Sequence, residues 1–119
     1  MLDELPGRLA ALRSTFDDIR AVVGVEQLQA EIAELSERAG APDLWDDPDA
    51  AQQVTSSLSH RQSELARVTA IERRLDDLDV LVELAREADD LETAAEAEAE
   101  CEALAKAIGE LEVRTLLDG

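Results

Sequence analysis

The chain has 119 residues and a formal net charge of −18, with Leu, Ala and Glu abundant and only one Phe and one Trp as aromatic residues. This length fits one modest domain. A chain this acidic repels phosphate backbones. We therefore expect no autonomous binding of nucleic acid. The composition is typical of long helices or a coiled coil.

Cysteine usage and the N-terminal sequence point to a reducing compartment. Cys101 is the only cysteine, which excludes a disulfide within the chain and a cysteine-based metal cage. The first residues lack the basic and apolar regions of a signal peptide, and no apolar run approaches the ~18 residues of a membrane span. We therefore expect a cytoplasmic protein without a membrane partner.

Apolar residues in the first forty positions follow a helical period. They step by three or four along residues 5–23 and again along 25–35, and Pro6 suits the first turn of the first segment. Gly24 separates the two segments, which leaves either one helix kinked at Gly24 or two separate helices. Gly40 and Pro42 predict the end of the second segment, with the glycine in a left-handed conformation.

The third segment, about 48–86, predicts one very long helix. Asp47 is placed to cap it, with Pro48 at its first position. Without an internal Gly or Pro, it would run roughly 55–60 Å at ~1.5 Å per residue. Its apolar stripe comprises Val54, Leu58, Leu65, Val68, Leu75, Leu78, Val82 and Ala85.

A turn at 87–90 and a shorter helix over about 91–111 complete the predicted fold. The apolar stripe of this helix comprises Ala94, Ala97, Cys101, Leu104, Ile108 and Leu111. Running back antiparallel, it covers only residues 68–86 of the long helix, which leaves the first two helices to cover 54–65. We therefore expect an all-α fold: an elongated antiparallel bundle or coiled-coil-like arm whose long helix has different partners at its two ends.

The last residues form a separate segment in this interpretation. We assign 1–111 to the helical domain and 112–119 to the start of a connection to a further domain. Val113, Thr115 and Leu117 alternate as in a strand, although a frayed last turn of helix fits equally well.

The sequence contains no recognisable catalytic constellation. His60 is the only histidine and is expected to be a solvated surface residue, and Cys101 a small core residue. The acidic runs are expected to be solvated helix faces, because alternate residues on a helix diverge. We therefore expect no enzyme activity, no metal and no cofactor.

Two features remain as candidate contacts. Trp45 is either a hot spot for a partner or, as we favour, an anchor buried at the corner between the second and third helices. Arg61, Arg67 and Arg74 lie along the long helix and form a possible basic contact. Arginines there are alternatively neutralised within the helix, as Arg73 and Arg74 would be by Asp77.

Three segments carry a resemblance to a known family. Residues 42–51 contain Trp45, Asp46, Asp47 and Pro48 and resemble the P-x-F/L-W-D-D-P-x-x-A signature of bacterial peptide chain release factor 2. Residues 81–90 and 112–119 are similar to that family's LLELAxExDD turn and to the segment ending its first domain. The matches occur in the family's order, and the Trp-Asp-Asp-Pro corner is the most specific. This corner also separates the chain from release factor 1, which shares the helical plan.

The resemblance implies an auxiliary helical domain of a factor that terminates translation at UAA and UGA. The Ser-Pro-Phe and Gly-Gly-Gln motifs, by which the family reads stop codons and promotes peptidyl-tRNA hydrolysis, are absent from this sequence, so no residue inherits those roles. The implied partners are the ribosome, near the stalk base of the large subunit, and the GTPase termination factor. A generic coiled-coil adaptor or oligomerisation module without a ribosomal role is the alternative.

Overall fold

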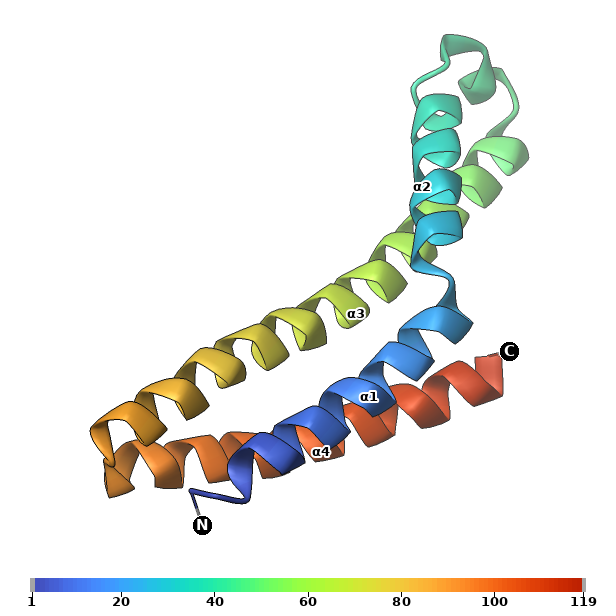
Figure 1. Ribbon diagram of the computed structural model, residues 1–119. Helices are drawn as coiled ribbons and strands as arrows, with labels where there is room; N and C mark the ends of the chain where they lie inside the picture. Colours follow the sequence, from blue (N-terminus) through green and yellow to red (C-terminus); the bar gives the residue numbers. More distant parts are fainter. Residues whose placement is uncertain (1, 119) are drawn as a thin grey trace. The chain divides into compact units, whose positions relative to one another are not determined.

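A computed structural model describes residues 2–118, which are almost entirely helical (Figure 1). The elements are α1 (Leu5–Val23), α2 (Val25–Ala39), a 3₁₀ helix η1 (Pro42–Asp46), α3 (Pro48–Ala88) and α4 (Leu91–Asp118). No strand occurs among the described residues. The all-α prediction is confirmed, and α3, at 41 residues, is the long helix expected from the sequence.

Gly24 divides the first two segments into separate helices. Its backbone is left-handed, at φ 69° and ψ 61°, a conformation that costs any residue with a Cβ atom. Its carbonyl nevertheless accepts the first hydrogen bond of α2, from the Leu28 N–H at 2.9 Å. The break is therefore a left-handed backbone conformation at one residue, and α1 and α2 are two separate helices, which settles the alternative that the sequence left open.

Aspartates begin the two longest helices. The Asp47 Oδ1 accepts a hydrogen bond from the Ala50 N–H at 3.3 Å, and α3 starts at Pro48, as predicted. The turn into α4 places Asp89 at φ 49°, a left-handed conformation that aspartate tolerates better than most residues. Asp90 then caps α4, accepting from the Glu92 N–H at 3.0 Å and from the Thr93 hydroxyl at 2.9 Å. The predicted turn at 87–90 is thus confirmed to within two residues.

The chain divides into two compact units, and the first combines residues up to Val22 with those from Val68 onward. In this unit α1 and α4 run alongside the second part of α3 (Figure 1). The buried side chains of α3 and α4 follow the three–four spacing of a coiled coil. They are Val68, Ile71, Leu75, Leu78, Val82 and Ala85 on α3, and Ala94, Ala97, Cys101, Leu104, Ile108 and Leu111 on α4.

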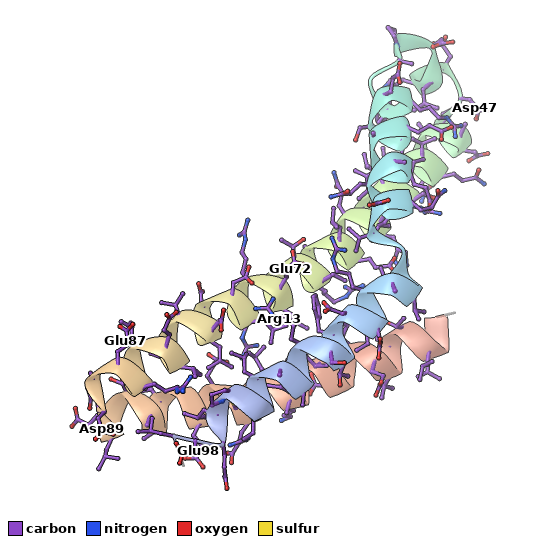
Figure 2. The ribbon with its side chains drawn as sticks, in the orientation of Figure 1. Arg13, Asp47, Glu72, Glu87, Asp89 and Glu98 are labelled. Carbon is purple, nitrogen blue, oxygen red and sulfur yellow. The ribbon has the colours of Figure 1, made fainter. Side chains whose placement is uncertain are left out.

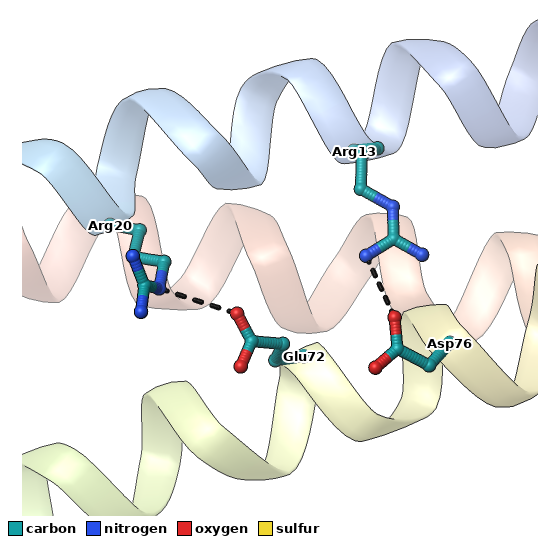
Figure 3. A network of polar contacts seen from close by, with 4 residues as sticks. All are labelled: Arg13, Arg20, Glu72 and Asp76. Carbon is teal, nitrogen blue, oxygen red and sulfur yellow. Dashed lines mark hydrogen bonds and ion pairs between the residues drawn. The ribbon is translucent and has the colours of Figure 1, made fainter.

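Helix α1 packs in this unit through four buried side chains, Leu5, Leu9, Phe16 and Ile19. Two ion pairs join α1 to α3, between Arg13 and Asp76 at 3.0 Å and between Arg20 and Glu72 at 3.3 Å (Figure 3). The expectation that the first helix covers residues 54–65 was therefore wrong. Periodicity shows that a helix has an apolar face, but it does not identify the segment on which that face packs.

The second unit, residues 23–67, contains α2, η1 and the first part of α3. Its buried apolar side chains are Val25, Leu28, Ala51 and Val54, while Leu58 and Leu65 are half-buried. Arg61 of α3 donates to Glu31 of α2 at 2.7 Å. The prediction that the long helix has different partners in its two parts is confirmed, with α2 beside the earlier part.

The residues after 111 continue α4 to Asp118 and form no strand. The predicted end of this helix at about 111 and the strand alternative for the last residues are therefore wrong, and the helical alternative is the one that the structure shows. The alternation of Val113, Thr115 and Leu117 covers too few residues to separate a period of two from one of 3.6. Val113, Leu116 and Leu117 are 56%, 71% and 80% exposed. The last turns of α4 thus present apolar side chains that the rest of the unit leaves uncovered.

Candidate functional site

Residues capable of chemistry are dispersed in the structure. His60 is exposed on α3, as expected for a solvated surface residue. Cys101 is fully buried, and burial raises the pKa of its thiol, an effect that Arg8 opposes and Glu98, Glu100 and Glu102 reinforce. Among the described residues, no three His, Cys, Asp or Glu side chains converge to hold a metal ion. The same residues include no helix long and apolar enough to span a membrane.

The segment between α2 and α3, residues 40–49, contains the family-signature residues and is called the corner here. Gly40 ends α2 with its N–H donating to the Ser36 and Glu37 carbonyls, both at 3.2 Å. The φ of Gly40 is −85°, which is right-handed, so the predicted left-handed cap was wrong. The hydrogen bonds from its N–H to the Ser36 and Glu37 carbonyls end α2 without a left-handed residue. The Leu44 N–H bonds to the Ala41 carbonyl at 3.2 Å, which closes η1.

Trp45 is exposed at this corner. Its side chain is 59% exposed, and η1 contributes no buried residue. The favoured interpretation of Trp45 as a buried anchor between helices therefore fails. Leu44, the preceding residue, is half-buried and turns inward instead. A single 3₁₀ turn directs neighbouring side chains about 120° apart, so only one of this pair faces the helices.

Four aspartates surround Trp45 along the sequence: Asp43, Asp46, Asp47 and Asp49, all exposed. Figure 2 shows Asp47 at the point where η1 gives way to α3. A shallow hollow of about 330 Å³ lies beside η1, and Arg38, Asp43, Leu44 and Asp47 contribute to its lining. Within the described residues, no ion pair joins these aspartates to Arg38 or to any other cation. The corner is therefore an exposed indole among solvated carboxylates.

The arginines proposed as a basic contact have different surroundings. Arg61 pairs with Glu31, and Arg74 pairs with Glu100 of α4 rather than with Asp77. The Arg67 Nε is buried without a hydrogen-bond partner among the described residues. Ion pairing therefore already occupies two of these three guanidinium groups, which reduces the positive charge that they offer to a partner.

A second hollow, of about 340 Å³, lies between α1 and the second part of α3. Pro6, Leu9 and Val82 form its apolar floor, and Arg13, Asp79, Glu83 and Arg86 line its rim. Charges of both signs on an open groove give no consistent electrostatic preference for one ligand. This hollow is therefore a weaker candidate than the corner.

Sequence reasoning missed the ion pairs of α1. Arg13 and Arg20 are seven residues apart and each follows an apolar stripe position, which places both on one flank of the buried face. Arg8 also faces α4, with its guanidinium 3.9 Å from a Glu98 carboxylate oxygen. The seven-residue spacing was a usable signal for contacts between helices.

Comparisons with known proteins agree on one family. The model of the PCRF domain matches residues 28–119, from within α2 to the end of the chain. Peptide chain release factor 2 of Beutenbergia cavernae is 58% identical over 119 residues, which are all of this chain and 32% of that protein. The proteins of the same name from Pseudarthrobacter chlorophenolicus and Streptomyces avermitilis are each 54% identical, covering 98% and 93% of this chain and 31% and 30% of those proteins.

The chain spans about a third of the length of these curated relatives. The PCRF match includes the corner and the α3–α4 hairpin, while α1 lies outside it yet packs on that hairpin. Similarity to release factor 2 extends over α1 as well, since the first of these alignments covers the whole chain. The chain therefore belongs to the PCRF domain family and is a helical domain of the release factor 2 type.

Proposed function

We propose that this chain is an auxiliary domain of a peptide chain release factor 2, acting in the termination of translation at UAA and UGA. The observation that carries this proposal is the 58% identity to a release factor 2 over all 119 residues. On this proposal the chain alone neither reads a codon nor releases peptide.

The proposed partner is the ribosome, approached near the stalk base of the large subunit, with an influence on the GTPase termination factor. The proposed compartment is the cytoplasm. Contacts through Arg61, Arg67 and Arg74 remain a prediction. The net charge of −18 favours protein over RNA as the direct contact of this domain, because carboxylates repel phosphates.

A domain exchange tests the proposal. The corresponding third of a full-length release factor 2 is replaced by this chain, and peptide release is measured on ribosomes programmed with UAA, UGA or UAG. We expect release at UAA and UGA only, at rates near those of the unaltered factor. A factor lacking the domain is the matched control, and a chimera no better than this control contradicts the proposal. Peptide release by the isolated chain would contradict the auxiliary role.

The exposed apolar residues near the end of α4 support one competing function, a self-associating adaptor. An adaptor of this kind forms a dimer whose stability depends little on salt, because apolar burial drives it. Sedimentation at micromolar concentration separates the two functions. A monomer supports the release-factor proposal, and a salt-insensitive dimer together with an inactive chimera supports the adaptor.

A further inference from the structure

We propose that the corner, residues 40–49, binds an arginine-rich segment of a partner protein, with Trp45 as the central contact. Trp45 is the only tryptophan of the chain, and 59% of its surface is exposed. A tryptophan left in water forgoes the large apolar burial that usually accounts for its presence. Tryptophan is also among the residues most enriched in the energetic centres of protein interfaces.

The apolar surface of the corner extends beyond the indole. Pro42 and Pro48, on either side of Trp45, are exposed as well. Proline restricts the backbone at both ends of η1, so the indole is displayed on a segment with little conformational freedom to lose on binding. The corner thus offers a partly preorganised apolar centre.

Carboxylates around this centre select the charge of the partner. Asp43, Asp46 and Asp49 are exposed. None of them takes part in an ion pair among residues 2–117. A guanidinium group can lie on the indole face while its N–H groups donate to a neighbouring carboxylate, so both features attract the same side chain. Arginine suits the site better than lysine, because its planar guanidinium group can stack on the indole and donate two parallel N–H hydrogen bonds to a carboxylate.

The same charges disfavour other occupants. RNA and anionic lipid surfaces bring further negative charge to four aspartates, and a second copy of this chain carries the same net charge of −18. A basic protein segment is the occupant that gains from both the indole and the carboxylates. The inference goes beyond the proposed function, because it requires no ribosome. Its test is independent of the domain exchange in release factor 2.

The full 119-residue chain is titrated with a short arginine-rich peptide, a lysine-rich peptide of equal charge and a single-stranded RNA oligonucleotide. Because Trp45 is the only tryptophan, its fluorescence reports on the corner directly. We expect the arginine peptide to change the emission at lower concentrations than the lysine peptide does, and RNA to have no effect. An emission change caused by RNA would overturn the choice of partner.

Variants separate a specific site from general attraction between opposite charges, with binding followed by the anisotropy of a labelled peptide. Trp45→Leu keeps an apolar side chain but removes the π face, and we expect it to weaken binding roughly three- to tenfold. Trp45→Phe should lie between Trp45→Leu and the unaltered chain. Circular dichroism checks that each variant keeps its helices.

Matched charge removal is the decisive control. The pair Asp43→Asn and Asp46→Asn removes two charges from the corner, and Glu96→Gln with Glu102→Gln removes two exposed charges from α4. We expect the corner pair to weaken peptide binding several times more than the α4 pair does. Equal effects of the two pairs, with Trp45→Leu binding normally, would show that net charge alone attracts the peptide and would overturn the proposal.

Discussion

Single residues determine where the helices of this chain begin and end, and Gly24 is the clearest case. Its φ of 69° is the only left-handed glycine conformation among the described residues. A Cβ atom built there meets only the Gln27 Cβ, at 3.9 Å, which is an ordinary contact. The requirement for glycine is therefore conformational and not a matter of space.

Replacing Gly24 by alanine should destabilise the chain by about 1–2 kcal/mol, the cost of a left-handed conformation for a residue with a Cβ atom. Gly40→Ala is the matched control, because φ is −85° there and the new Cβ would lie 3.6 Å from the nearest atom, the Glu37 carbonyl oxygen. Urea unfolding measures both changes. A Gly24→Ala variant as stable as Gly40→Ala would contradict the assigned backbone conformation.

Some features at the ends of the helices could be predicted from the sequence and others could not. Asp47 and Pro48 predict the start of α3 correctly, because the preferences of capping residues and proline depend on only a few neighbouring residues. The exposure of Trp45 could not be predicted, since it depends on which of two adjacent apolar residues in η1 faces the helices. Local chemistry is readable in a sequence, whereas the choice between neighbouring side chains is made by packing.

At the scale of whole elements, the three–four spacing identified most of the buried face of α3 and α4. It could not predict that α1 packs on these two helices, because that pairing depends on contacts distant in sequence. The arginines of α1 contributed information that the apolar residues lacked, since Arg13 and Arg20 meet Asp76 and Glu72 of α3. Charges flanking an apolar stripe can thus indicate the partner of a helix.

The cap of α4 should make its stability depend on pH in strong acid. The Thr93 hydroxyl, and after it the Glu92 N–H, hold the pKa of Asp90 below its ordinary value of 3.8. Because the folded pKa is the lower one, the stabilisation is complete above pH 3.8 and is lost as the pH falls through the folded pKa.

Comparison of the unaltered chain with Asp90→Asn isolates this contribution from the other carboxylates. We expect the unaltered chain to be the more stable at pH 6, with the difference in unfolding free energy shrinking below pH 4. Thr93→Val removes the largest cause of the shift, so it should flatten the pH dependence. A difference that stays constant down to pH 2 would show that Asp90 does not act through its ionised form.

The charge of the whole molecule is strongly unbalanced, and the ion pairs between its helices are weak. Five ion pairs join helices among the described residues, each between side chains that are about a third or more exposed. Such pairs contribute about 0–1 kcal/mol each. The chain has 29 acidic residues and only 11 basic ones, so the excess carboxylates repel one another.

Salt should therefore stabilise the chain. Raising NaCl from about 0.01 M to about 1 M shortens the Debye length from ~30 Å to ~3 Å, which screens the long-range repulsion. We expect the melting temperature to rise by roughly 4 °C, which corresponds to about 1 kcal/mol for a chain of 119 residues. The Glu96→Gln and Glu102→Gln variant should respond less. A melting temperature that falls with salt would show that the ion pairs dominate.

The burial of Cys101 has a practical consequence for spectroscopy. The only thiol of the chain is fully inaccessible, and its raised pKa leaves little thiolate to react with maleimides. A cysteine introduced at an exposed position such as Glu96 would therefore take up a spin label or a fluorophore selectively. The native thiol can stay in place, so a labelled chain retains its unaltered core.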